Sequence, residues 1–168
     1  MEIRLLTAED ANAYWELRLE ALLQNPEAFA TSYEEAIERQ HPVEKVANNL
    51  RTEGNYTYGA LENGQLVGML TLLVEQPLKL KHRANIFAVY VSPSIRGLGV
   101  GNTLVTKAIE KAKSIESLVK LNLSVVSSNK QAKRLYEKLG FKVFGVEEKA
   151  LKLADTYYTE EHMTLILK

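Results

Sequence analysis

Three alternating glycines, Gly97, Gly99 and Gly101, are the most specific chemical signal in this chain. They lie between an apolar stretch rich in β-branched and aromatic residues and a stretch whose apolar residues recur at helical spacing. A strand that turns through glycines into a helix leaves backbone N–H groups pointing at one place, and the helix dipole adds partial positive charge there. This pattern predicts a binding site for a phosphate-bearing ligand.

Known phosphate-binding loops differ in the residues that accompany their glycines. A Walker loop requires Lys and then Ser or Thr after its last glycine, whereas Asn102 and Thr103 follow Gly101 here. A dinucleotide-binding loop requires a third glycine at position 102 or 104, and Asn102 and Leu104 occupy those positions. A tight turn without any ligand also stays open, because glycines serve that purpose too.

The pattern Arg-x-x-Gly-x-Gly at Arg96, Gly99 and Gly101 resembles the coenzyme A pyrophosphate loop of the GNAT superfamily of N-acetyltransferases. Residues 129–141 read Asn-x-x-Ala-x-x-Leu-Tyr-x-x-x-Gly-Phe and resemble the second signature of that family. Both motifs occur in the order and at the spacing of the family, and together they cover about residues 86–143. The resemblance implies that acetyl-CoA is the cosubstrate.

The resemblance implies a cofactor site built mostly from backbone groups. The strand that contains Val89 splays away from the strand at residues 121–126, and the pantetheine arm pairs with the exposed backbone like an added strand. The glycine loop supplies N–H donors to the pyrophosphate, and Arg96 adds a positive charge. The residues assigned to the cofactor are Val89, Tyr90, Val91, Arg96, Gly97, Leu98, Gly99, Val100, Gly101, Asn102, Asn129, Ala132 and Tyr136. Two interpretations stay open for Lys130, Lys133 and Lys138, which are a solvated helix face or further phosphate contacts.

Acetyl transfer to an amine leaves a thiolate that needs a proton, and the resemblance gives this role to Tyr136 as general acid. A tyrosine, with a pKa of ~10, can supply a proton to a thiolate whose thiol has a pKa of ~8.5. The N–H of Val89 or of a neighbour would hold the carbonyl oxygen. No metal is expected, because the three histidines show no metal-ligand spacing.

The acceptor amine must lose a proton, and many family members place a glutamate for this on the strand before the glycine loop. Residues 83–91 contain no carboxylate in this chain. Glu34 is a predicted acceptor or base contact, and water is an alternative proton carrier. We expect the acceptor site between the first two helices and the last hairpin, where aromatic and acidic side chains suit a cationic amine. Other residues open for this site are Glu35, Glu160, His162, Tyr157 and Tyr158.

Hydrophobic periodicity and turn signals predict the elements that position these residues. Helical spacing over residues 7–24 ends before Pro26, with Arg18 expected to reach solvent at the edge of the apolar face. Asn63 and Gly64 predict a tight hairpin. We expect strands at residues 3–6, 56–61, 66–74, 83–91, 121–126, 141–150 and 157–167, and further helices at 32–50 (interrupted at His41 and Pro42), 99–113 and 129–139.

This order of elements predicts an α/β (α+β) fold in which helices flank a mixed, mostly antiparallel central sheet. The resemblance adds that a splayed pair of strands forms the coenzyme A cleft. The chain has 168 residues and shows neither a linker nor a repeat, so we expect residues 1–168 to form a single N-acetyltransferase domain.

Composition and net charge limit the classes of partner that this chain can have. With 21 basic and 21 acidic residues, the formal net charge is zero, which argues against nucleic acid and anionic membranes as partners. The chain contains no cysteine, which excludes an acyl-cysteine intermediate. An apolar signal run and a span of membrane length are both missing, which favours a cytoplasmic location.

We therefore expect an acetyltransferase that moves an acetyl group from acetyl-CoA to a primary amine of a small molecule or peptide, by direct attack in a ternary complex. The alternative is a catalytically weak sensor or assembly module that binds coenzyme A. Because members of the family often form dimers, a homodimer stays open.

Overall fold

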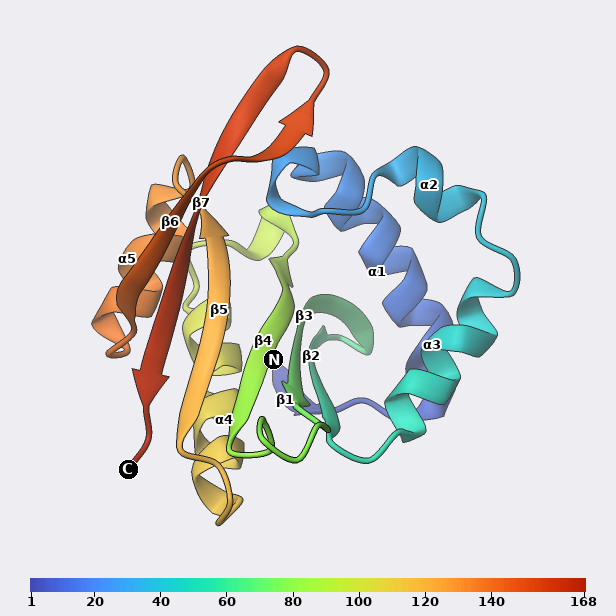
Figure 1. The fold of residues 1–168 in the computed structure, drawn as a ribbon. Coiled ribbons are helices and arrows are strands. Elements are labelled where there is room, and N and C mark those ends of the chain that lie inside the picture. Colours follow the sequence, from blue (N-terminus) through green and yellow to red (C-terminus); the bar gives the residue numbers. More distant parts are fainter.

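One seven-stranded sheet organises the computed structural model, which describes all 168 residues (Figure 1). The strands are β1 (Glu2–Leu5), β2 (Asn55–Glu62), β3 (Gln65–Val74), β4 (Arg83–Val91), β5 (Lys120–Val126), β6 (Lys142–Leu153) and β7 (Thr156–Ile166). The helices are α1 (Ala11–Gln24), α2 (Tyr33–Ile37), α3 (Pro42–Arg51), α4 (Val100–Ser114) and α5 (Lys130–Lys138), with short 3-10 turns η1 (Ala8–Asp10), η2 (Pro26–Ala28) and η3 (Pro93–Ile95). The strand order is β1-β2-β3-β4-β5-β7-β6, so the predicted mixed sheet flanked by helices is confirmed.

Two apolar clusters hold helices against opposite faces of the sheet. The larger cluster contains Leu104 of α4, Leu121 of β5 and Tyr136 of α5. The smaller cluster contains Leu17 of α1 and Tyr90 of β4. Alternate residues of a strand point to opposite faces, so a single strand such as β4 can contribute to both clusters.

The sheet opens between β4 and β5, which are its only parallel neighbours. Their ladder pairs residues 83–85 with residues 120–122 and then stops, although both strands continue. Figure 1 shows the two strands diverging from that point toward their carboxyl ends. The predicted splay of this strand pair is therefore present, and it exposes backbone edges that have no partner in the sheet.

A β-bulge bends β4 beside this opening. Phe87 pairs with Thr71 and Tyr90 pairs with Met69, so two residues of β4 oppose one residue of β3. Ala88 lies in the bulge with a φ of 53°, in the left-handed region that alanine rarely adopts. Such bulges redirect the strand and its amides, and this one lies where β4 leaves β5.

Helix boundaries match most of the predicted ones. The helical region expected at residues 32–50 is divided into α2 and α3, because His41 adopts a left-handed φ of 51° and Pro42 starts a new helix. Ser32 and Glu35 form a capping box at the start of α2. None of the helices combines the length and the apolar character that crossing a membrane requires.

Candidate functional site

The glycine loop leads into the amino terminus of α4 and leaves its backbone donors free. Gly97 and Gly99 have φ values of 83° and 80°, which favour glycine over any other residue. Thr103 is the first residue of α4 whose N–H reaches a carbonyl, that of Gly99 at 3.0 Å. The N–H groups of residues 97–102 donate to no protein acceptor. A Cβ at either Gly97 or Gly99 would meet nothing within 4 Å, so the loop borders open space, and its unused donors suit an anion-binding loop.

Three predicted parts of the site meet at Gly101. A Cβ at this position would lie 3.6 Å from Leu135 of α5 and 3.9 Å from Val91 of β4. The helix α4 therefore begins directly beside both the end of β4 and the second sequence motif. Val100 is buried in the larger cluster and Asn102 is half-buried, so the backbone of these residues, rather than their side chains, is what the loop offers.

Arg96 braces the loop in this structure. Its Nε donates to the carbonyl of Val91 at 2.9 Å, and its Nη2 donates to Asn25 Oδ1 at 2.8 Å. The guanidinium carbon also lies 5.6 Å from the centroid of the Tyr90 ring. Arg96 thus ties the loop to the ends of β4 and α1, and no acidic side chain neutralises its charge.

The end of β4 offers backbone rather than side chains to a ligand. Val89 and Val91 are half-buried and pack against the larger cluster, whereas Tyr90 is buried on the α1 face. The Tyr90 hydroxyl and the Ser92 hydroxyl both donate to Glu20 Oε1, at 2.9 and 2.8 Å. Burial and this carboxylate raise the pKa of Tyr90. Its side chain therefore serves to fix β4 against α1.

Two residues of the second motif have clear structural positions. Asn129 caps α5, because its Oδ1 accepts from the N–H of Ala132 at 3.1 Å. Its side-chain NH₂ group makes no hydrogen bond within the protein. The predicted contact of Asn129 with the pantetheine arm would use this free group, while the cap keeps the side chain in place.

Tyr136 has an enclosed ring and a hydroxyl without a protein partner. The ring packs edge-on against Phe141 with 6.0 Å between centroids, and burial raises the pKa of Tyr136. Four unpartnered polar side-chain atoms are sealed from solvent in this structure, and the Tyr136 hydroxyl is not among them. It therefore reaches an accessible surface in protonated form, as a general acid must.

The acidic residues of α2 lie at the surface. Glu34 is exposed and makes no hydrogen bond within the protein. Glu35 accepts from the N–H of Ser32 at 2.9 Å, which makes its carboxylate part of the helix cap. The structure brings neither carboxylate into contact with β4, the glycine loop or Tyr136.

The lysines of α5 differ in their partners within the protein. Lys133 donates to Glu161 of β7 at 2.9 Å, and this hydrogen bond raises the pKa of the lysine. Lys130 and Lys138 are exposed or half-exposed on the helix surface without such a partner.

A hydrogen-bonded chain across three strands joins the candidate His162 to Ser124 and Glu147, which sequence reasoning did not single out. His162 Nδ1 lies 2.7 Å from Ser124 Oγ, and His162 Nε2 lies 3.1 Å from Glu147 Oε2. Glu160 lies close enough that it, Glu147 and His162 each place one ligand-type atom within 4.8 Å of the others. Strand alternation could indicate that these side chains share a face, but only the register of β5, β6 and β7 shows that they meet.

Arg18 is half-buried, so its expected exposure to solvent is only partial. We expected it to reach solvent at the edge of α1, but its guanidinium carbon lies 4.5 Å from the centroid of the Phe29 ring. Its Nη1 is enclosed and has no hydrogen-bond partner. The reason is the extended backbone after η2, which brings Phe29 back over the helix.

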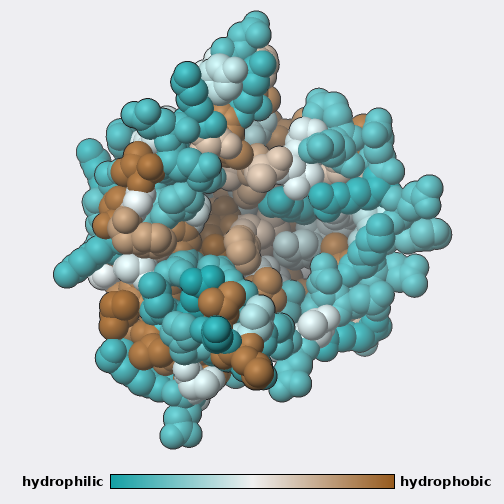
Figure 2. Space-filling model, in the orientation of Figure 1, coloured by the Kyte–Doolittle hydropathy of each residue, from teal (hydrophilic) through white to brown (hydrophobic).

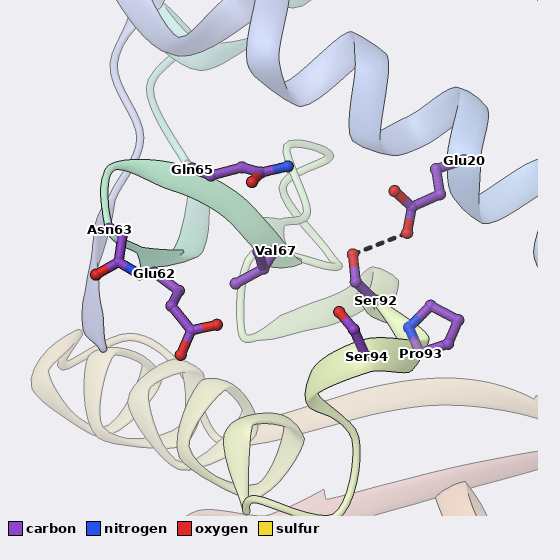
Figure 3. Close-up of a pocket in the computed structure, with 8 residues that line it drawn as sticks. All are labelled: Glu20, Glu62, Asn63, Gln65, Val67, Ser92, Pro93 and Ser94. Atoms are coloured by element: carbon purple, nitrogen blue, oxygen red, sulfur yellow. Dashed lines mark hydrogen bonds between the residues drawn. The ribbon is translucent and has the colours of Figure 1, made fainter.

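A polar pocket of about 440 Å³ lies between the β2–β3 turn, α1 and η3, and the bonded pair Glu20 and Ser92 belongs to its lining (Figure 3). Figure 3 shows the Ser92 hydroxyl directed at Glu20 across one end of the pocket. A separate hollow with apolar residues on its floor lies on the face drawn in Figure 2, between the α1 side and the β5 side. The lining of the polar pocket is Glu20, Glu62, Asn63, Gln65, Val67, Ser92, Pro93 and Ser94.

Comparison with curated proteins gives partial matches to N-acetyltransferases. The chain is 28% identical over 111 residues to spermidine N(1)-acetyltransferase of Vibrio cholerae, which covers 65% of this chain and 62% of that protein. It is 31% identical over 100 residues to L-amino acid N-acetyltransferase AaaT of Escherichia coli, which covers 57% of this chain and 61% of that protein. The chain thus spans about three fifths of the length of these curated relatives.

Comparison with solved structures and with family sequence patterns extends the match to the fold. The acetyltransferase of GNAT family from Streptococcus pneumoniae superposes with a TM-score of 0.88 at 21% identity, over 99% of both chains. The structure of yncA, a putative acetyltransferase from Salmonella typhimurium with its cofactor acetyl-CoA, superposes with a TM-score of 0.85 at 21% identity. The superposition covers 100% of this chain and 94% of that chain. The sequence pattern of the acetyltransferase (GNAT) family matches residues 15–141. Because this match covers most of the chain and both motifs, the chain belongs to the acetyltransferase (GNAT) family.

Proposed function

We propose that this chain transfers an acetyl group from acetyl-CoA to a primary amine. The observation that carries the proposal is the meeting, at Gly101, of a loop of free backbone N–H groups, the open edge of β4 and the helix that contains Tyr136. A structural neighbour solved with its cofactor acetyl-CoA, and curated relatives named as N-acetyltransferases, support it.

The chain's own groups fit acetyl-CoA. The free N–H groups of residues 97–102 bind the pyrophosphate, aided by the dipole of α4. The unpaired edge of β4 beyond Asn85 binds the amides of the pantetheine arm as an added strand would. The Asn129 side chain donates to the same arm. Acetyl-CoA supplies the acetyl thioester that the amine attacks.

Tyr136 and Val89 act on the reacting atoms. The Tyr136 hydroxyl donates a proton to the departing sulfur, and its raised pKa keeps it protonated at neutral pH. The N–H of Val89, next to the bulge at Ala88, holds the carbonyl oxygen as negative charge develops on it. In this proposal the acetyl group passes directly to the amine, and the chain contains no cysteine that could form an acyl-cysteine intermediate.

The amine enters from the face opposite Tyr136. Leu123 and Met163 pair across β5 and β7 and point into the larger cluster with Tyr136. Ser124 and His162 are the next pair along the same ladder, so they point to the other face. Ser124 lies two residues beyond the end of the β4–β5 ladder, at the opening itself.

We therefore assign proton uptake from the amine to His162, with Glu147 and Ser124 fixing its ring. Nε2–H of His162 donates to Glu147, which leaves Nδ1 to accept from the Ser124 hydroxyl. The amine gives its proton to Ser124 Oγ, and the hydroxyl proton of Ser124 passes to Nδ1 of His162. Glu34 of α2 stays a proposed contact for the acceptor.

An acceptor screen tests the proposal. The chain is incubated with acetyl-CoA and a panel of amines that includes polyamines, amino acids and peptides, and release of the coenzyme A thiol is followed. We expect release that depends on one class of amine. Tight binding of acetyl-CoA by calorimetry, with no amine-dependent release from any class, would instead favour a coenzyme A-binding sensor.

A further inference from the structure

Arg18 carries a charge that the protein does not neutralise. It lies on α1 one turn after Tyr14, with its guanidinium against the ring of Phe29 at 4.5 Å. Its Nη1 is enclosed without a hydrogen-bond partner, and no carboxylate forms an ion pair with it. Burial, and to a lesser extent the cation of Arg39, lower the pKa of Arg18, and Tyr14 offsets only part of this.

Arg18 is half-buried, and a guanidinium with an enclosed, unpaired nitrogen and no counter-charge is costly to the folded state. Buried charges in proteins are normally paired or hydrogen-bonded, because desolvation of an isolated ion costs several kcal/mol. The smaller apolar cluster and Phe29 would accept an apolar side chain at this position at no such cost. The missing partner is therefore expected from outside the chain.

The position of Arg18 connects it with the reacting end of the site. Tyr14, one turn earlier on α1, lines a pocket of about 170 Å³ together with Thr71, Phe87 and Ala88. Ala88 is the bulge residue of β4, adjacent to the N–H of Val89 that we assign to the carbonyl oxygen. Arg18 thus lies one helical turn from a residue of this pocket, on the helix that packs in the smaller cluster, on the face opposite α4 and Tyr136.

Given the proposed acetyl transfer, we propose that Arg18 binds a carboxylate of the acceptor, so that the acceptor is an amino acid or a close analogue. The planar guanidinium presents paired N–H donors that match a carboxylate, and the stacked Phe29 ring holds its plane. Holding the carboxylate there leaves the neighbouring amine to face the acetyl group. The same uncompensated cation repels polyamines, which carry only positive charge.

The test compares each L-amino acid with its primary carboxamide, which keeps the amine and removes the negative charge. The parent chain is expected to show a kcat/KM at least about 10-fold higher for the acid than for the amide, the range of a charge-assisted hydrogen bond. In Arg18→Gln this preference disappears because KM for the acid rises, while kcat/KM for the amide stays nearly unchanged. Arg18→Lys gives an intermediate preference, because the charge remains and the paired donors do not.

Two controls separate ligand binding from other effects. Arg39→Gln removes a nearby surface cation that bonds only Thr31, and it is expected to keep the preference for the acid. Arg18→Met removes the half-buried charge and is expected to unfold at the same or a higher temperature than the parent, which shows that Arg18 does not serve the fold.

The carboxylate site would be overturned, with acetyl transfer intact, if the active parent preferred amides. It would also be overturned if Arg18→Gln lowered kcat/KM for the acid and for the amide by the same factor. If the parent releases no coenzyme A with any amine, acetyl transfer itself fails. Calorimetric titration with N-acetyl amino acids and their amides, with coenzyme A present, then tests Arg18 without turnover. The site is supported if the parent binds the acids more tightly than the amides and Arg18→Gln abolishes that difference. Equal affinity of the parent for acids and amides overturns it.

Discussion

Burial keeps the Tyr136 hydroxyl protonated, which limits the direction in which it can exchange a proton. Enclosure of the ring raises the pKa of the hydroxyl, which stays protonated beyond the ordinary tyrosine range, while the hydroxyl itself remains free of protein partners. A group in this state can give a proton at neutral pH but cannot take one. Acid catalysis at the sulfur, and not base catalysis at the amine, is therefore the role its environment permits.

Replacing Tyr136 by Phe tests that role. We expect kcat to fall by about 100-fold or more, the usual contribution of a positioned acid, with KM for acetyl-CoA within about twofold of the parent. Steady-state kinetics measure both. Tyr58 of β2 provides the matched control, since burial also raises its pKa but it lies outside the site, and Tyr58→Phe should leave kcat unchanged. Equal kinetics for Tyr136→Phe and the parent would remove Tyr136 from the mechanism.

A side chain at Gly99 would both strain the backbone and obstruct the ligand. Gly64, which has the same backbone conformation outside the site, separates these two effects. Gly99 and Gly64 share a φ of 80°, and a Cβ at either would meet nothing within 4 Å. Replacement by Val should cost each variant about 1–2 kcal/mol of unfolding free energy, because a side chain opposes that φ. Only Gly99→Val should weaken acetyl-CoA binding in calorimetry, by about 10-fold or more. Equal affinities in the two variants would contradict the pyrophosphate loop.

At the scale of elements, the start of α1 depends on an ion pair between strand and turn. Arg4 of β1 donates to both carboxylate oxygens of Asp10, at 2.9 and 2.8 Å, and the N–H of Thr7 donates to the same group at 2.7 Å. The hydrogen bonds from Arg4 lower the pKa of Asp10 to about 2. The carboxylate thus joins β1 to η1 ahead of α1, the helix that contains Arg18 and Glu20.

The lowered pKa of Asp10 sets the sign of a pH effect on stability. An aspartate with a pKa of ~3.9 when unfolded and about 2 when folded contributes fully above pH ~4, and the contribution is lost as pH falls toward 2. Asp10→Asn should lower the unfolding free energy by about 1 kcal/mol at pH 7, measured by urea denaturation. The difference from the parent should shrink below pH 4. Glu9→Gln, an exposed neighbour, should show neither effect, and a difference that is constant with pH would argue against the ion pair.

Local signals predicted most elements of the fold. Ser32 caps α2 and Asn129 caps α5 as their types suggest, and Asn63 with Gly64 forms the expected hairpin turn. Each of these depends on a few neighbouring residues, which a sequence shows directly. The interruption at Pro42 was equally readable, because proline cannot continue a helix.

Contacts between distant elements could not be predicted in the same way. The chain from Ser124 through His162 to Glu147 requires the register of three strands, and that of β6 with β7 shifts twice. The partial burial of Arg18 requires Phe29 to fold back over α1, which helical periodicity does not report. The bulge at Ala88 carries no glycine to mark it. The acceptor side of the site was therefore less predictable than the cofactor side, which local motifs define.

At the scale of the whole molecule, the opening between β4 and β5 separates two chemical environments. On the α4 face lie the free N–H groups of the loop and the Tyr136 hydroxyl, which together suit the phosphate and sulfur ends of one ligand. On the opposite face lie His162 and Arg18, which suit the amine and carboxylate of another. A thioester in the opening would thus meet a proton donor on one side and the acceptor on the other.

Acetyl-CoA should complete this open sheet, and hydrogen exchange can detect it. Without ligand, amides that face the opening in residues 86–91, and those of residues 97–102, should exchange quickly, because they have no acceptor. Ligand at about 100 times its Kd should slow them, and should raise the unfolding temperature by about 5–10 °C. The exchange rates of residues 83–85, which already pair with β5, should slow only as much as the gain in global stability requires. Uniform slowing along the chain, with no local excess in the two segments, would contradict binding in the opening.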